Sequence, residues 1–177
     1  MTKEFILLDR DGVINEDRSK SVLSSDEFVL LPFAAEAIAL ANRKGYGVLV
    51  ITNQACVGRG ELASDELYAI HRYMCKLIEM AGGRIEEIYV CPHTDADRCD
   101  CRKPAPGLIS RAHAKYGFDP GGTWLVGDAP LDIDAAIAAG CRPALVRTGK
   151  GAGISVAPGI PVFRDLMHFS EQLRQLT

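Results

Sequence analysis

Two aspartates close to the N-terminus are the first residues whose types and spacing suggest chemistry. Asp9 and Asp11 are separated by one residue, follow an apolar run and precede Gly12. Such a run is typical of a buried strand in a parallel sheet, where ligands lie beyond the carboxyl ends of the strands. Two neighbouring carboxylates repel each other when both are ionised, so they need a cation between them or must share a proton. The pair therefore predicts a metal site, an acid/base pair, or both.

Three further polar groups follow the ends of later apolar runs. They are Thr52-Asn53-Gln54, the cysteine-rich loop 91–103, and Asp128 with Asp132. A single aspartate after a strand is more often a turn or capping residue. Four polar groups at the ends of parallel strands would, however, converge on one crevice. They therefore predict a single active site.

Asp9, Asp11 and Asp128 would together offer a hard oxygen site. Mg²⁺ suits such a site because it binds few carboxylates, keeps several waters and binds substrate phosphate. Lys103 follows the cysteine-rich loop and would supply the positive charge that balances a phosphate group. We therefore expect a Mg²⁺ site that acts on a small phosphorylated molecule.

The cysteine-rich loop has the composition of a structural zinc site. Cys91, His93, Cys99 and Cys101 supply three thiolates and one imidazole, and five residues separate the two pairs. Four protein ligands form a closed tetrahedral set, which leaves no open position for catalysis. The alternative is a set of free thiols in a flexible loop.

The rest of the chain supplies the elements that would position these residues. Strands are expected at 5–8, 47–51, 85–90, 123–126, 142–146 and 160–163, and helices at 33–44, 64–82, 106–117, 131–139 and 166–176. This alternation predicts an α/β class, with one Rossmann-like three-layer domain over 1–177 and a mainly parallel central sheet. The connections after the first two strands are short, so we expect no large cap domain.

Composition restricts the partners and the compartment. The 177 residues are 47% hydrophobic and 24% charged, with a net charge of −3. This balance is typical of a soluble globular protein and gives no reason to expect nucleic acid or a membrane as partner. No apolar run approaches the roughly 20 residues of a membrane span, and no signal peptide is recognisable. We expect a cytoplasmic monomer with reduced cysteines.

The polar groups, taken in order, resemble the motifs of the haloacid dehalogenase superfamily of phosphatases. They stand as Asp9-Arg10-Asp11-Gly12-Val13, Thr52, Lys103-Pro104, and Gly127-Asp128 to Asp132. The zinc loop followed by Arg102-Lys103-Pro104 is similar to that of the small zinc-bearing members of the superfamily. Those members include the heptose-bisphosphate and histidinol-phosphate phosphatases.

The resemblance implies a phosphoric monoester hydrolase that works through an aspartyl-phosphate intermediate. Asp9 would be the nucleophile, and Asp11 would be the general acid and then the general base. Thr52 and Lys103 would hold the phosphoryl oxygens. Mg²⁺ would bind Asp9, the backbone carbonyl of Asp11, and Asp128. Acid catalysis in the first step would require the pKa of Asp11 to be raised relative to that of Asp9.

Candidate substrate contacts lie around this set. They are Asp17, Asn53, Gln54, Arg59 and Arg102. Arg102 would anchor the non-reacting part of the substrate, such as a second phosphate. The leading substrate is the 7-phosphate of D-glycero-D-manno-heptose 1,7-bisphosphate, on the route to nucleotide-activated heptose for the lipopolysaccharide core. Histidinol phosphate or another small phosphate ester is the alternative within the class, and an inactive zinc-stabilised binding module is the alternative outside it.

Some residues depart from the heptose enzymes or have no assigned role. Arg18-Ser19-Lys20, Ala55-Cys56 and Ala129 replace residues that are usual in those enzymes, and all lie where the distal part of a substrate would be read. These differences concern which substrate is recognised rather than the phosphoryl transfer itself. Three histidines on expected helices are interpreted as structural, namely His71, His113 and His168.

Overall fold

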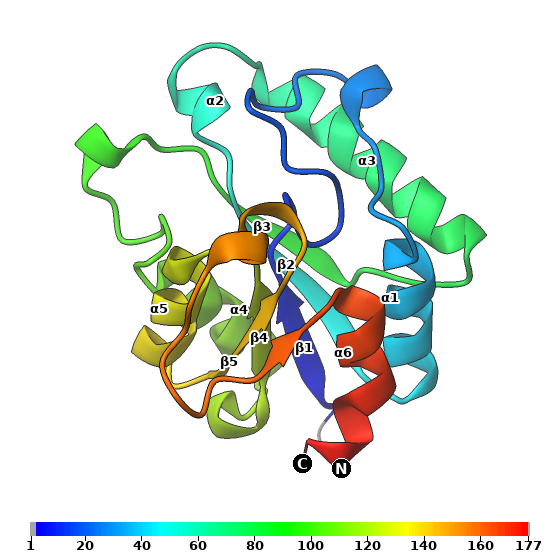
Figure 1. The fold of residues 1–177 in the computed structure, drawn as a ribbon. Helices are drawn as coiled ribbons and strands as arrows, with labels where there is room; N and C mark the ends of the chain where they lie inside the picture. The colour runs from blue at the N-terminus through cyan, green and yellow to red at the C-terminus, as the bar shows by residue number, and fades with distance from the viewer. Residues whose placement is uncertain (1–2, 177) are drawn as a thin grey trace.

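A six-stranded sheet forms the centre of the computed structural model, which describes residues 3–176 (Figure 1). The strands are β1 (Phe5–Leu8), β2 (Gly47–Asn53), β3 (Glu87–Cys91), β4 (Trp124–Gly127), β5 (Arg142–Val146) and β6 (Val162–Phe163). They lie in the order β3-β2-β1-β4-β5-β6, and every pairing is parallel. The predicted α/β class with a parallel sheet is confirmed.

Helices cover both faces of this sheet. They are α1 (Ala34–Arg43), α2 (Ala55–Gly58), α3 (Ser64–Met80), α4 (Gly107–Tyr116), α5 (Pro130–Ala138) and α6 (Leu166–Gln172). Side chains alternate between the faces along β1, so Ile6 and Leu8 pack with α1, α3 and α6, whereas Leu7 packs with α4 and α5. Two hydrophobic cores therefore lie between the sheet and the helices on its two faces, which gives the three predicted layers.

The connections that follow β1 and β2 are short. Between β1 and α1 lies only one turn of 3-10 helix at Ser25–Glu27, and between β2 and α3 lies only α2. Within residues 3–176, neither connection contains an inserted domain, as expected. The same described range contains no helix with the length and apolarity needed to cross a membrane.

The carboxyl ends of the strands lie at one edge of the sheet, which is uppermost in Figure 1. Because β1 lies between β2 and β4, the polar residues that follow these three strands are brought side by side. The loop 91–103 follows the edge strand β3 and leads back to the same edge. This topology positions the candidate site.

Candidate functional site

A crevice of ≈ 270 Å³ opens at the carboxyl edge of the sheet. The predicted site residues that line it are Asp9, Asp11, Asp17, Asn53, Gln54, Arg59, Arg102, Lys103 and Asp128. Thr52 is fully buried, and its Oγ1 accepts a hydrogen bond of 2.9 Å from Gln54 Nε2. The four polar groups of the sequence thus meet at one place.

Lys103 is a buried lysine between two carboxylates. Its Nζ lies 2.8 Å from Asp9 Oδ1 and 2.6 Å from Asp132 Oδ1. Burial lowers the pKa of Lys103, but the two carboxylates outweigh burial and raise it, so the ammonium stays charged. Asn53 fixes the backbone at this point, because its Oδ1 accepts from Lys103 N and its Nδ2 donates to Lys103 O. The charge is therefore held against Asp9.

Asp11 is held by hydrogen-bond donors on both carboxylate oxygens. Its Oδ1 accepts from Arg10 Nη2 at 2.8 Å, from Arg10 Nε at 3.3 Å and from Asn15 Nδ2 at 2.9 Å. Its Oδ2 accepts from Gln54 Nε2 at 2.8 Å. Such a set of donors stabilises the ionised carboxylate and fixes its orientation.

The pKa values of the two aspartates lie in the reverse of the expected order. Burial raises the pKa of Asp9 to about 7, against the opposing charge of Lys103. Burial also acts to raise the pKa of Asp11, but the Arg10 guanidinium and the hydrogen bonds on Asp11 outweigh it and lower the pKa. Among the protein's own groups, Arg10 therefore places the pKa of Asp11 below that of Asp9, which is the reverse of the order expected for acid catalysis by Asp11.

Asp9 and Asp128 form a carboxylate pair that fits Mg²⁺. Ligand oxygens of Asp9, Asp128 and Asp132 lie within 4.8 Å of one another. Burial raises the pKa of Asp128 to about 6, although the backbone N–H of Lys150 donates to its Oδ2 at 2.7 Å. Raised pKa values of two buried carboxylates indicate too little nearby positive charge, which a divalent cation would supply. Asp132 is instead engaged at both oxygens, by Lys103 Nζ at Oδ1 and by Ala129 N at Oδ2.

Two glycines allow neighbouring loops to close around Asp128. Gly12 and Gly149 have φ values of +82° and +56°, and a Cβ at either position would overlap the Asp128 carboxylate. Thr148 Oγ1 ties the two loops together by donating to Gly12 O at 2.6 Å. The loop 147–153 was not predicted to belong to the site, although its glycine-rich composition was a signal.

The cysteine-rich loop brings its four candidate ligands together. Distances among the three Sγ atoms and the Nδ1 of the imidazole, where contacts occur, lie between 3.2 and 3.7 Å. A tetrahedron with Zn–S bonds of about 2.3 Å has edges of about 3.7 Å. All six cysteines of the chain are free thiols. The donor set Cys91, His93, Cys99 and Cys101 thus fits a zinc ion.

The outer candidates line the crevice but already have partners. Arg59 forms two hydrogen bonds of 2.8 Å with Glu61, and Arg102 pairs with Asp95. Asp17 lies 3.4 Å from Lys150 Nζ. Asn53 bonds to the backbone of Lys103, and Gln54 bonds to Asp11. Both side chains position the central residues.

The fold and the crevice together define a hydrolase of the haloacid dehalogenase class. The features that define it are a parallel sheet with an Asp-x-Asp loop after the central strand, a buried lysine, and a further aspartate after the neighbouring strand. A family model described as HAD-hydrolase-like matches residues 100–164.

Comparison with whole proteins narrows the class. The D-glycero-beta-D-manno-heptose-1,7-bisphosphate 7-phosphatase of Neisseria meningitidis is 42% identical over 97% of this chain and 95% of its own length. The enzyme of that name from Pseudomonas aeruginosa is 40% identical, over 99% of this chain and 100% of its own. The chain belongs to the D-glycero-D-manno-heptose-1,7-bisphosphate 7-phosphatase family.

A solved structure agrees with this assignment. The crystal structure of D,D-heptose 1,7-bisphosphate phosphatase from Bordetella bronchiseptica, complexed with magnesium and phosphate, superposes with a TM-score of 0.93. It is 39% identical and covers 98% of this chain and 99% of its own. The family resemblance found in the motifs is confirmed over the whole chain.

Proposed function

We propose that this protein is a Mg²⁺-dependent phosphatase that hydrolyses the 7-phosphate of D-glycero-D-manno-heptose 1,7-bisphosphate. The observation that carries the proposal is the meeting of Asp9, Lys103 and Asp128 in one crevice, in a chain 42% identical to an enzyme with that name. The similar enzymes from Neisseria and Pseudomonas are named for the β-anomer, so we assign the β-anomer as preferred. The free thiols suit a reducing compartment, and we place the protein in the cytoplasm as a monomer.

The first step is transfer of the phosphoryl group to Asp9. Its carboxylate attacks phosphorus in line, and the P–O bond to the sugar breaks. The leaving oxygen takes a proton from the protonated form of Asp11, which the surrounding donors make a stronger acid by lowering its pKa. The Lys103 ammonium, held 2.8 Å from Asp9, is positioned to bind a phosphoryl oxygen as charge spreads in the transition state. The Thr52 hydroxyl donates a hydrogen bond to a second phosphoryl oxygen.

The second step is hydrolysis of the aspartyl-phosphate. Asp11, now ionised, takes a proton from water, which attacks phosphorus and releases Asp9. The donors on Asp11 favour this ionised form. Asp9 and Asp128, with the backbone carbonyl of Asp11, would hold Mg²⁺, which neutralises phosphate charge when it is bound.

Substrate choice is tested by comparing turnover of two phosphate esters. With saturating Mg²⁺, we expect kcat/KM for the heptose 1,7-bisphosphate to exceed that for histidinol phosphate by at least about 100-fold. Only the former has a second phosphate, which Arg59 and Arg102 of the crevice could bind. Release of inorganic phosphate is the measurement. Faster hydrolysis of histidinol phosphate would replace the leading substrate with the alternative.

The dependence of Mg²⁺ stabilisation on pH tests the metal site. A carboxyl with a raised folded pKa binds more protons in the folded than in the unfolded state, so its ionisation removes stability as pH rises. Asp128 and Asp9 therefore lower stability as pH rises toward and through about 6 and about 7. Mg²⁺ offsets this loss, so we expect the rise in Tm with Mg²⁺ to grow between pH 5 and 8. This growth should shrink in Asp128→Asn, whereas a pH-independent rise would contradict the assignment.

A further inference from the structure

Arg10, between the two aspartates of the first motif, is a fully buried cation that the reaction scheme does not use. Its side chain has no exposed surface. Its Nε and Nη2 both donate to Asp11 Oδ1, at 3.3 and 2.8 Å. The remaining nitrogen, Nη1, lies 3.1 Å from His71 Nε2. The guanidinium is thus held at both ends, by Asp11 on one side and by His71 on the other.

His71 reaches this position from helix α3, 61 residues further along the chain. It is 6% exposed. A guanidinium only donates hydrogen bonds, so Nε2 of His71 must be the unprotonated acceptor. Burial, together with the charge of Arg10, lowers the pKa of His71 to about 4, which keeps the ring neutral. His71, interpreted from the sequence as structural, thus has a buried charged partner in Arg10.

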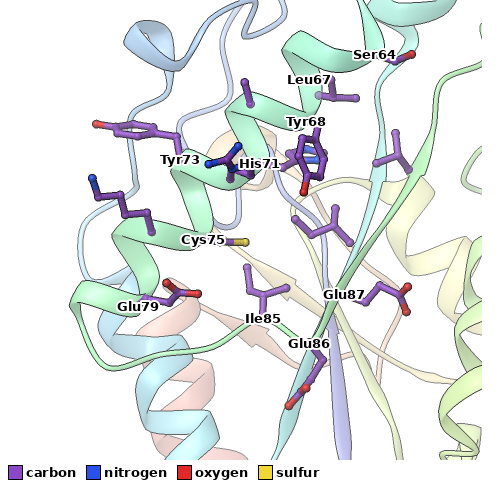
Figure 2. Close-up of a pocket in the computed structure, with 15 residues that line it drawn as sticks. Ser64, Leu67, Tyr68, His71, Tyr73, Cys75, Glu79, Ile85, Glu86 and Glu87 are labelled. Atoms are coloured by element: carbon purple, nitrogen blue, oxygen red, sulfur yellow. The ribbon is translucent and has the colours of Figure 1, made fainter.

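His71 is not among the residues that line the active-site crevice. It lines a groove of ≈ 1010 Å³ between α3 and β3, and Figure 2 shows it on α3 beside Tyr68. The groove is lined by none of the predicted catalytic residues. Its contact with Arg10 Nη1 therefore connects α3 to the residue that holds Asp11 in the crevice.

The contacts of Arg10 set the direction of the Asp11 carboxylate. Two donors from one rigid, planar group converge on a single oxygen, Asp11 Oδ1, and fix its position more closely than one donor would. Asn15 and Gln54 add one bond each, but both donate from neutral amides, whose bonds to a carboxylate are weaker than those of a charged guanidinium. A proton carrier must be oriented within fractions of an ångström to serve its reaction.

We propose that His71 and Arg10 form a positioning pair, in which His71 fixes the guanidinium of Arg10 and Arg10 in turn orients Asp11 for proton transfer. This inference rests on the proposed phosphatase reaction for its kinetic test but not for its structural test. Neither residue touches the reacting atoms, so both are positioning residues. Helix α3 thereby contributes to the catalytic centre.

Three substitutions of His71 separate an acceptor from mere volume. His71→Gln places an amide oxygen near the position of Nε2, so it preserves the bond to Arg10. His71→Asn has the same chemistry but is one methylene shorter, so its oxygen falls short of Arg10 Nη1. His71→Leu fills space without any acceptor. The pair of amides is a matched control, because they share polarity and hydrogen-bonding groups and differ in reach.

Kinetics give the first readout. We expect His71→Leu and His71→Asn to lower kcat by about ten- to a hundredfold, with KM changed less than about twofold, because proton transfer and not binding is impaired. His71→Gln should stay within about threefold of the unsubstituted enzyme. In an Asp11→Asn background, His71→Leu should change turnover of an activated aryl phosphate by less than about twofold, since the residue it positions is gone. Equal losses in Asn and Gln variants, or full additivity with Asp11→Asn, would overturn the proposal.

Crystal structures of His71→Leu and His71→Gln give a readout that needs no substrate. In His71→Leu we expect the Arg10 guanidinium to turn and lose at least one of its two bonds to Asp11 Oδ1, and in His71→Gln we expect both bonds to remain. An unchanged Arg10–Asp11 geometry in His71→Leu would refute the positioning pair even in an active phosphatase. Absence of phosphatase activity in the unsubstituted protein would instead refute the proposed function, and the crystal structures would still decide the inference.

Discussion

Replacement of Asp9 by asparagine is expected to abolish turnover. The amide nitrogen and oxygen of asparagine cannot attack phosphorus to form an acyl phosphate, so kcat should fall by on the order of 10⁴-fold or more. The fold should survive, because asparagine has the same shape and its Oδ1 can still accept from Arg10 N and Lys103 Nζ, as Asp9 Oδ1 does. Lys103 also keeps its ion pair with Asp132. The measurement is phosphate release with saturating Mg²⁺, beside the Tm of each variant.

The matched control for Asp9→Asn is Asp134→Asn. Asp134 lies on α5, and its side chain is exposed, so the same chemical change there should leave kcat unaltered. A second readout is the covalent intermediate, which mass spectrometry of acid-quenched enzyme should detect on Asp9 and should not detect in Asp9→Asn. Turnover above about 1% of normal in Asp9→Asn would exclude Asp9 as the nucleophile.

The sequence predicted the parts of the site that depend on local order along the chain. Asp9 and Asp128 directly follow β1 and β4, and Thr52 lies near the end of β2; parallel strands place their carboxyl ends at one edge. Their meeting follows from the topology without knowledge of any side-chain rotamer. The candidate zinc ligands could also be predicted, because Cys91 and Cys101 lie close together in the sequence and the spacing of the cluster is itself the signal.

The sequence could not predict contacts that depend on how a helix is rotated. Arg10 and His71 meet only because α3 packs over the sheet with that one face inward. A helical histidine carries no mark of its partner. The same limit applies to Asn53 and Gln54, whose contacts with the Lys103 backbone and the Asp11 carboxylate depend on side-chain directions that the sequence does not give.

Backbone contributions were also beyond the sequence. The N–H of Lys150 donates to Asp128, and this bond depends on glycine conformations at two positions in separate loops. The pKa order of Asp9 and Asp11 depends on Arg10, whose direction the sequence does not give. The pKa values at this site therefore depend on contacts that only the three-dimensional structure gives, whereas the identity of the predicted site residues follows from the sequence.

Loss of the zinc ion is expected to have the second large effect. Three sulfur atoms and a ring nitrogen lie 3.2–3.7 Å apart in the cluster of Cys91, His93, Cys99 and Cys101. Without a cation, thiolates so close would repel one another, and protonated thiols would offer only weak hydrogen bonds. We expect purified protein to contain about one zinc per chain, because structural zinc binding is coupled to folding of its loop. Zinc content much below this value would favour the free-thiol alternative.

Cys101→Ser tests what the zinc does for the active site. Cys101 and Cys91 are fully buried in the core that packs against α4 and α5, so loss of the metal should loosen the second core as well as the loop. We expect the variant to lose zinc and roughly 3 kcal/mol or more of stability. Cys101 is two residues before Lys103, so a loosened loop would displace the ammonium that binds the phosphoryl group in the transition state. We therefore expect kcat to fall by a larger factor than KM rises. Cys75→Ser on α3, outside the cluster, is the control and should keep its zinc and its activity. A zinc-free Cys101→Ser enzyme with full kcat would show that Asn53 and Asp132 alone suffice to hold Lys103 against Asp9.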